Sequence, residues 1–189
     1  MVDFKINVTQ DYWEEDLFNC EATADAARKM DEIARRYQGQ RLRQEEELLT
    51  IDESEEQYNL DIIGTGKTRV VIDLPDSWVR GESDCIAKIQ WDPQYMQTAN
   101  EIDVWENASG RVAALLAPIL DFSELKQWLI MPKAERYTGL TIKETSKIVK
   151  KLRQWLTESG YKSTDIRRAN VGRIEGRDVV IDYGNLKER

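Results

Sequence analysis

The chain has 189 residues, of which 33% are charged and 41% hydrophobic, and its net charge at neutral pH is −8. This balance is typical of a soluble globular protein with one good core or two small lobes, and it excludes a disordered chain. The acidic charge argues against nucleic acid as the main partner. The longest apolar run, Val112–Leu120, is interrupted by Pro118 and is too short to span a bilayer, so no membrane partner is expected.

The two cysteines, Cys20 and Cys85, have neither the spacing of metal ligands nor that of a disulfide framework. The chain also opens without the pattern of a signal peptide. These features favour a reducing compartment, and a cytoplasmic protein is expected.

The first 59 residues are expected to form a polar, helical extension. A helix is predicted over Glu21–Tyr37 and is expected to end at Gly39. A second helix is predicted over Arg41–Leu49, followed by an acidic loop at Asp52–Gln57. The extension is expected to buttress the next part of the chain, and a partner-binding arm is the alternative. The apolar face of the first helix is predicted to contain Ala24, Ala27, Met30, Ile33, Ala34 and Tyr37.

Two interpretations compete for the glycine-rich segment Gly64–Thr68. A P-loop ends in Gly-Lys-Thr, but it needs a glycine where this chain has Asp61, and a helix must follow directly. The residues that follow are β-branched and lead to Pro75, which predicts a strand. A strand–turn–strand hairpin is therefore favoured.

The next two elements carry a lysine and a carboxylate. Cys85–Trp91 is predicted to be a strand that contains Lys88, and Gln94–Asn107 a helix that contains Glu101. Taken alone, a strand lysine usually faces solvent and a helix carboxylate is usually solvated. Lys88 and Glu101 therefore indicate a functional site only in combination with the other motifs of the chain.

Two apolar strands are predicted next, over Leu115–Leu120 and Leu125–Met131. A turn is expected between them, near Asp121–Ser123. The second strand leads into Pro132.

The clearest helix of the chain is predicted over Thr141–Ser159. Glu144 suits its first turn, and Gly160 is expected to stop it. Its basic face is expected to be solvated. The predicted apolar face consists of Ile142, Thr145, Ile148, Val149, Leu152, Trp155 and Leu156.

The C-terminal stretch Asp165–Gly184 predicts a loop, a hairpin and a turn. Its strands are expected at Val171–Ile174 and Val179–Ile181, joined by a tight turn at Glu175–Gly176. Antiparallel strands run side by side, so the entry and the exit of the hairpin lie close together.

Three oxygen-bearing side chains are expected to converge at these hairpin ends. Asn170 stands at the entry, Asp182 at the exit, and Asp165 in the loop before them. Carboxylate and amide oxygens suit a hard cation and the phosphates that it carries.

This C-terminal pattern resembles the protein kinase-like fold. The segments Gln97–Glu106 and Trp128–Met131 look like its compact phage and prokaryotic (haloarchaeal-type) members. The catalytic loop of that family ends in Asp-x-x-x-x-Asn, and an Asp-Phe-Gly turn follows a short hairpin later. Asp165, Asn170 and Asp182–Gly184 match these positions. Ser163–Thr164 stand where the family usually has His-Arg, and Tyr183 replaces Phe.

The glycine-rich hairpin resembles the nucleotide-covering loop of the same family, Gly-x-Gly-x-x-Gly-x-Val. Gly64, Gly66 and Val71 match this pattern. Arg69 replaces the third glycine, which departs from the close backbone approach that the family makes to phosphates.

The resemblance also gives the middle of the chain a role in nucleotide binding. Lys88 matches the lysine of the Val-Ala-Ile-Lys strand, and Glu101 matches its helix glutamate, with Glu106 as the second choice of partner. The ion pair would hold the lysine against the α- and β-phosphates of ATP. The backbone of Ile130–Lys133, with Met131 at its centre, would contact the base.

The catalytic roles follow from the resemblance in the same way. Asp165 would accept the proton of the attacking hydroxyl, Arg167 would neutralise charge on the transferring group, and Asn170 and Asp182 would hold Mg²⁺. The cofactors implied are ATP and Mg²⁺, and the phosphate acceptor, for which a protein is one candidate, is left open.

The implied fold is α+β, a minimal protein kinase-like fold in three parts. Residues 1–59 form the helical extension, residues 60–131 an antiparallel N-lobe sheet with one helix, and residues 132–189 a reduced helical C-lobe with the catalytic-loop hairpin. The chain ends at Arg189, so no activation segment is expected after the Asp-Tyr-Gly turn.

Two other functions stay open from the sequence. One is a catalytically weak or inactive kinase-like protein that regulates or binds a partner, with or without nucleotide. The other is a structural protein in which the motifs are accidental. Fold alone does not decide activity, so the choice depends on the site.

Overall fold

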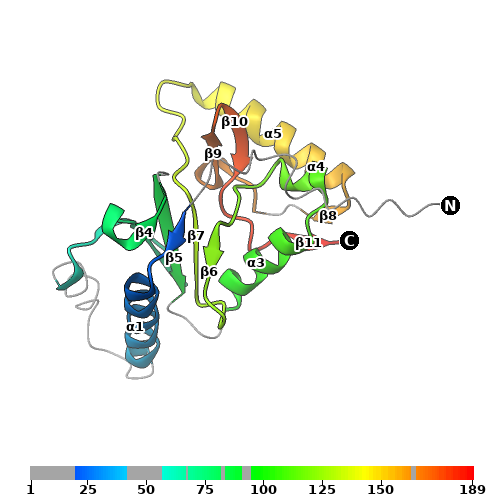
Figure 1. Cartoon of the computed structure of the whole chain (residues 1–189). Helices are drawn as coiled ribbons and strands as arrows, with labels where there is room; N and C mark the ends of the chain where they lie inside the picture. Colours follow the sequence, from blue (N-terminus) through cyan, green and yellow to red (C-terminus); the bar gives the residue numbers. More distant parts are fainter. Residues whose placement is uncertain (1–19, 42–56, 67, 82–83, 91–94, 163–164) are drawn as a thin grey trace.

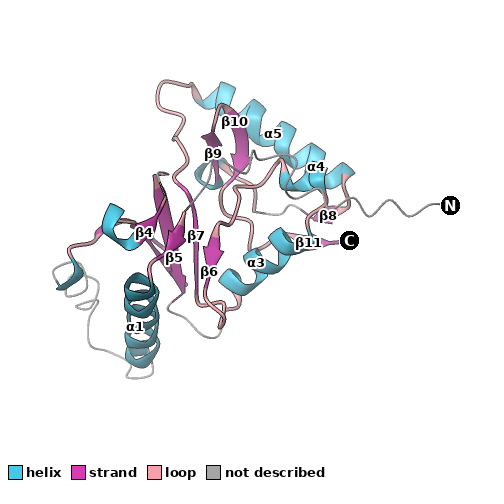
Figure 2. Ribbon diagram, viewed as in Figure 1, coloured by secondary structure: helices cyan, strands magenta, loops and turns pink. Residues whose placement is uncertain are grey.

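The structure is a computed structural model that describes residues 20–41, 57–66, 68–81, 84–90, 95–162 and 165–189. It is a mixed α+β fold in which helices flank a central sheet (Figures 1 and 2). The elements, in chain order, are β1 (Glu21–Ala22), α1 (Ala24–Arg41), β2 (Asp61–Thr65), β3 (Arg69–Asp73), the 3-10 helix η1 (Asp76–Trp78), β4 (Val79–Arg80), β5 (Cys85–Gln90), α3 (Gln97–Asn107), α4 (Gly110–Ala113), β6 (Asp121–Phe122), β7 (Trp128–Pro132), α5 (Ile142–Glu158), β8 (Tyr161–Lys162), the 3-10 helix η2 (Arg168–Asn170), β9 (Val171–Ile174), β10 (Arg177–Val180) and β11 (Lys187–Glu188).

The central sheet is antiparallel and has five strands in the order β2-β3-β5-β7-β6. Its register pairs Val71 with Lys88 and Lys88 with Leu129. Directly paired residues point to the same face, and successive residues point to opposite faces. This register therefore decides which side chains meet α1 and which meet the site.

Helix α1 covers one face of the sheet (Figure 1). Met30 and Ile33 are buried there, and Asp31 accepts a hydrogen bond at 2.7 Å from the indole nitrogen of Trp128. Helix α1, the described helix of the extension, therefore packs on the sheet, as the buttress interpretation predicts. The sheet residues in this apolar cluster are Val70, Ile72, Ala87, Ile89, Trp128 and Ile130.

The boundaries of α1 differ from the prediction. The helix begins at Ala24, because β1 precedes it and pairs with β4, and it continues past Gly39 to Arg41. Ala26 rather than Ala24 is buried on its apolar face. The predicted second helix, apart from Arg41, and most of the predicted acidic loop lie outside the described residues.

The opposite face of the sheet belongs to a second apolar cluster. Ile86, Leu129 and Met131 contribute from the sheet, Ile102 from α3, and Leu152 from α5. The cluster continues into β9, β10 and the C-terminal turn. One core thus joins the sheet to the C-terminal part of the chain.

The prediction of a strand over Leu115–Leu120 is wrong. This segment follows the short helix α4 and belongs to no strand of the central sheet. The Val180 N–H donates to the Leu115 carbonyl at 2.8 Å, and the Ala117 N–H donates to the Val180 carbonyl at 2.9 Å. Hydrogen bonds to β10 thus replace sheet pairing here. Strand β6 begins only at Asp121, where a turn was predicted, and β7 starts at Trp128.

Helix α5 closely follows its prediction. Thr141 is the N-cap and forms a capping box with Glu144, and Gly160 follows the last turn with a φ of +91°. Thr145, Val149, Leu152 and Leu156 of the predicted apolar face are buried. Two other members of that face, Ile142 and Trp155, are exposed.

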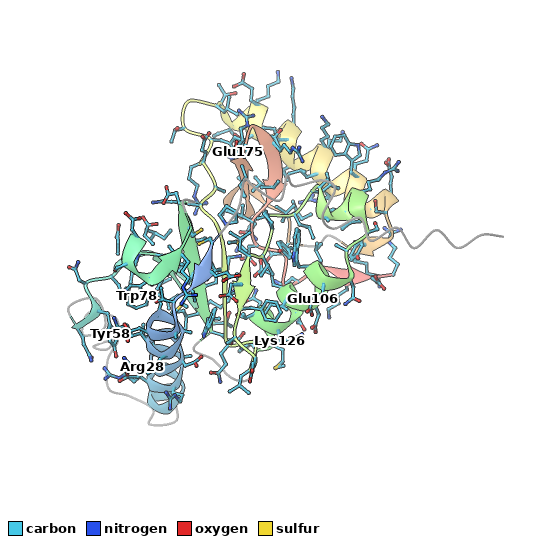
Figure 3. The ribbon with its side chains drawn as sticks, viewed as in Figure 1. Arg28, Tyr58, Trp78, Glu106, Lys126 and Glu175 are labelled. Carbon is cyan, nitrogen blue, oxygen red and sulfur yellow. The ribbon has the colours of Figure 1, made fainter. Side chains whose placement is uncertain are left out.

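The C-terminal hairpin also forms where the sequence predicts it. Strand β9 has the predicted bounds, and β10 begins two residues earlier and ends one residue earlier than predicted. Glu175, which Figure 3 shows at the tip, has a φ of +48° and Gly176 a φ of +73°. Positive φ at both central residues is typical of a type I′ turn, which matches the twist of the strands.

In the part of the chain that the structure describes, every helix is too short or too polar to cross a bilayer.

The turn after β10 packs closely against the start of α3, and a single methyl group tests this contact. A Cβ on Gly184 would clash with the backbone oxygen of Gln97. We expect Gly184→Ala to lower the free energy of unfolding by about 1–3 kcal/mol, because the α3 backbone must shift. Urea denaturation measures the change.

Gly66→Ala is the matched control for this substitution. Its added Cβ would lie 3.5 Å from the Arg69 carbonyl, which is ordinary contact, so we expect a change within about 0.5 kcal/mol. Equal effects of the two substitutions would contradict the proposed close packing at Gly184.

Candidate functional site

The four side chains of Arg69, Lys88, Glu101 and Asp182 form a charge cluster on the inner face of the sheet. Arg69 comes from β3 and Lys88 from β5, and they share a face because Val71 pairs with Lys88. Glu101 comes from α3, and Asp182 follows β10. Elements from across the chain therefore converge on one point.

Glu101 is the centre of the charge cluster and is fully buried. Its Oε1 accepts a hydrogen bond from Lys88 Nζ at 2.8 Å, and its Oε2 accepts one from Arg69. The Tyr183 N–H also donates to Oε1, at 3.2 Å. Lys88 and Glu101 thus meet as the sequence predicts.

Asp182 joins the charge cluster through Arg69 and through the backbone beside it. Arg69 Nη2 donates to Asp182 Oδ1 at 2.7 Å. Lys88 Nζ donates to the carbonyl oxygen of Ile181. The lysine amine and the terminal aspartate therefore lie on the same side of the sheet.

The formal charges within the cluster balance, with two cations and two carboxylates. Buried charges are tolerated only when paired, because removing them from water costs several kcal/mol each. Burial lowers the pKa of Lys88 below its ordinary value, with the Arg69 charge acting in the same direction and Glu101 opposing it. Burial by itself would raise the pKa of Asp182, but the charges of Arg69 and Lys88 outweigh it, so this pKa is lowered.

Asn170 ties the predicted catalytic loop to the exit of the hairpin. Its Nδ2 donates to the Asp165 carbonyl at 2.9 Å, and its own carbonyl accepts the Ile181 N–H at 2.9 Å. Asn170 is buried. The three predicted oxygen-bearing side chains therefore stand on directly bonded segments.

Asp165 is more exposed than the charge cluster. Its Oδ2 accepts a hydrogen bond from Asn185 Nδ2 at 3.1 Å, and its Oδ1 lies 3.5 Å from Arg167 Nε. The Arg167 side chain is 68% exposed, so the pair is weak. Both side chains are free to meet a ligand from solvent.

The strands β2 and β3 form the predicted hairpin around the glycine-rich segment. Because a strand and not a helix follows that segment, the P-loop interpretation is excluded. The ladder is irregular between Ile62 and Gly64, and the Gly66 N–H donates to the Arg69 carbonyl at 2.8 Å. Lys67 lies outside the described residues.

Met131 and its neighbours form the end of β7, where the resemblance places contacts to a base. Met131 is fully buried and pairs with Ile86. The Lys133 N–H already donates to the Asp84 carbonyl at 2.8 Å. A base bound at this segment would therefore have to form hydrogen bonds with backbone groups other than the Lys133 N–H.

Glu106, the second choice of partner for Lys88, lies elsewhere. Its Oε2 is 3.4 Å from Lys126 Nζ, an exposed pair that joins α3 to the turn between β6 and β7 (Figure 3). Glu101 and Glu106 therefore have separate roles, one buried in the charge cluster and one at the surface.

Arg69 is the member of the charge cluster that the sequence did not predict. In the sequence it is only a departure from the third glycine of the loop. In the structure it is 6% exposed and links Glu101 to Asp182. Arg69 lies two residues before Val71, so in a strand both side chains point to the same face. The sequence shows this spacing, but only the pairing of Val71 with Lys88 shows that Arg69 shares its face of the sheet with Lys88.

The donors that the resemblance assigns to Mg²⁺ suit that ion. Among the described residues, no three His, Cys, Asp or Glu side chains are placed to hold a metal together. Asp182 Oδ2 and Asn170 Oδ1 accept no hydrogen bond from the described residues. Mg²⁺ usually takes one or two protein oxygens and completes its shell with water and phosphate oxygens. Asp182 and Asn170 are the residues that would hold it in the role the resemblance implies.

No family model and no curated protein matches the sequence. Any functional assignment therefore rests on the geometry of the site itself.

The charge cluster predicts a large stability effect for its central carboxylate. Glu101→Gln removes the negative charge between Lys88 and Arg69 and leaves these buried cations under-neutralised. We expect the free energy of unfolding to fall by about 3–5 kcal/mol in urea denaturation. Glu106→Gln, the same change at the surface of the same helix, should stay within about 0.5 kcal/mol. A small effect at both positions would contradict the central role of Glu101.

The lowered pKa of Asp182 predicts an acid dependence of stability. The folded protein binds this proton less readily than the unfolded chain, for which the ordinary value is 3.8. The stabilisation is thus complete above that value and is lost as the pH falls through the folded pKa. We expect Asp182→Asn to lose less stability than the wild type between about pH 4 and pH 2. Asp76→Asn, at an exposed position, should follow the wild type in urea denaturation at each pH.

Proposed function

We propose that the chain is a phosphotransferase that depends on ATP and Mg²⁺ and has a minimal protein kinase-like fold. The observation that carries the proposal is the meeting of Lys88, Glu101 and Asp182 from three separate elements. Each of these residues is a weak signal in the sequence alone. Their convergence at one buried point supports a common function.

The arrangement of elements supports the fold proposal. The antiparallel sheet, with its glycine hairpin and α3, corresponds to the proposed N-lobe of residues 60–131. Helix α5 and the hairpin of β9 and β10 correspond to the reduced C-lobe of residues 132–189. In this proposal α1 is an added helix that supports the sheet on its outer face.

Nucleotide binding is assigned to the sheet side of the site. Lys88, held by Glu101, would contact the α- and β-phosphates, and the hairpin containing Gly64 and Gly66 would cover them. The end of β7 around Met131 would contact the base. When bound, ATP supplies the phosphoryl group and Mg²⁺ neutralises its oxygens.

Transfer is assigned to the loop side of the site. Asp165 would accept the proton of the attacking hydroxyl as that oxygen bonds to the γ-phosphorus and ADP leaves. Arg167 would neutralise charge on the transferring group. Asn170 and Asp182 would hold the metal. Positioning and charge neutralisation supply most of the catalysis in such reactions, so these groups are sufficient in kind.

A second function is favoured by one specific observation, the ion pair between Arg69 and Asp182. Arg69 occupies one carboxylate oxygen of the proposed metal ligand and adds a positive charge beside it. Such a site would bind nucleotide phosphates with a weaker demand for metal. The alternative is therefore a kinase-like regulatory protein that binds nucleotide or a protein partner with little catalysis.

One experiment separates these functions. ATP with Mg²⁺ at about a hundred times its dissociation constant is expected to raise the melting temperature by about 5–10 °C. With γ-labelled ATP, transfer of label to the chain itself or to acceptors in a cell extract is expected. Asp165→Ala should keep the thermal shift and lose transfer by at least about a hundredfold. Asp182→Ala should lose transfer and the Mg²⁺-dependent part of the shift.

The control is Asp76→Ala, at an exposed position on η1, which should keep both the thermal shift and label transfer. A thermal shift without transfer in the wild type would support the regulatory function. No thermal shift with ATP and Mg²⁺ would contradict both proposed functions.

A further inference from the structure

An open hollow of about 290 Å³ lies beside the predicted catalytic loop, apart from the charge cluster. Its lining comes from the segment after β7, the first turn of α5, η2 and the start of β9. Thr145 and Val171 are buried and form its floor, whereas Arg136 and Arg168 are exposed and form its rim. None of the residues assigned above to phosphoryl transfer lines it.

The two charged residues that line the hollow, Arg136 and Arg168, are both positive. Neither Arg136 nor Arg168 has an ion-pair partner among the described residues, and none of the described lining residues is acidic. Neighbouring arginines differ in this respect, because Arg173 pairs with Asp178 at 3.0 Å and Arg167 lies 3.5 Å from Asp165. Two unpaired guanidinium groups at one hollow stand out in a chain with a net charge of −8.

Hydrogen bonds hold the walls of the hollow in place. Arg136 Nη1 donates to the Ala169 carbonyl at 3.1 Å, which ties the segment after β7 to η2. The Tyr137 hydroxyl lies 2.9 Å from the Gly172 carbonyl. The Thr145 hydroxyl donates to the Thr141 carbonyl at 3.2 Å, which leaves its oxygen able to accept. The site is thus formed before any ligand binds.

Size and chemistry together define the class of ligand. Ligand pockets usually enclose about 300–1,000 Å³, so this hollow suits a molecule of few heavy atoms. A guanidinium group matches the two oxygens of a carboxylate or phosphate with a pair of parallel hydrogen bonds. Two of them, with a threonine hydroxyl on the rim at Thr138, favour a small anion over a neutral or cationic ligand.

We propose that this hollow binds the carboxylate or phosphate group of a small molecule that accepts the phosphoryl group. The acceptor role rests on the proposed phosphotransferase function, whereas the anion site does not. Arg168 lies between Asp165 and Asn170 in the chain, and it lines the hollow. An anion held there would place the rest of its molecule beside the proposed base.

Isothermal titration of the full chain tests the anion site. The probes are inorganic phosphate, succinate and succinamide, the last of which has the shape of succinate without its charge. We expect phosphate or succinate to bind and succinamide not to bind. Arg136→Gln and Arg168→Gln should each weaken binding by about ten- to a hundredfold, the effect of losing one charge-assisted hydrogen-bonded pair.

Arg111→Gln is the matched control, because Arg111 is exposed in α4 and does not line the hollow. It should leave anion binding unchanged. Binding of phosphate alone would identify a phosphate-bearing ligand, and binding of succinate alone a carboxylic acid. Binding of neither anion, or equal weakening by all three substitutions, would overturn the proposal.

A second titration, with a non-hydrolysable ATP analogue and Mg²⁺ present, tests the acceptor role. Unchanged or tighter anion binding supports an acceptor that occupies the site together with the nucleotide. Displacement of the anion by the analogue would overturn the acceptor role. The two proposals can fail separately, because anion binding is measured without nucleotide and label transfer is measured without the probes.

Discussion

The structure depends on one buried carboxylate, that of Glu101. A lone charge at this depth would cost several kcal/mol, and it is tolerated because two cations and a backbone N–H surround it. Those partners come from β3, β5 and the turn after β10, so neutralising one side chain fixes the relative positions of three distant segments. Apolar packing could hold the same elements together, but it would not select one arrangement so strictly, because hydrophobic contacts are non-directional.

The need to neutralise the buried Glu101 carboxylate also fixes the geometry of the candidate site. The Tyr183 N–H and the Ile181 carbonyl both bond to members of the charge cluster, so the backbone on each side of Asp182 is held. Asp182 is therefore presented in one position at the edge of the cluster, partly open to solvent. In the proposed phosphotransferase this carboxylate would be shared between Arg69 and Mg²⁺, so the strength of the Arg69 pair would decide between catalysis and binding without catalysis.

Local signals made much of the fold predictable. The first turn of α5, with Glu144, and the tight turn at Glu175–Gly176 each depend on a few neighbouring residues, and both form where the sequence places them. The segment Leu115–Leu120 failed because its partner, β10, lies more than fifty residues away, and apolar composition does not reveal which strand supplies the hydrogen bonds. Arg69 was missed for the same reason, since its role depends on the register between β3 and β5 rather than on its neighbours.

Charge distinguishes the two candidate binding regions of the molecule. The charge cluster is formally neutral, so a nucleotide with several negative charges would bring uncompensated charge to it, and Mg²⁺ is the ordinary means of reducing that charge. Arg136 and Arg168 beside the hollow have no ion-pair partner among the described residues, so the small anion proposed there would need no metal. An acidic chain repels anions at long range. A small anion is therefore expected to bind at the hollow with Arg136 and Arg168, next to the loop that carries Asp165.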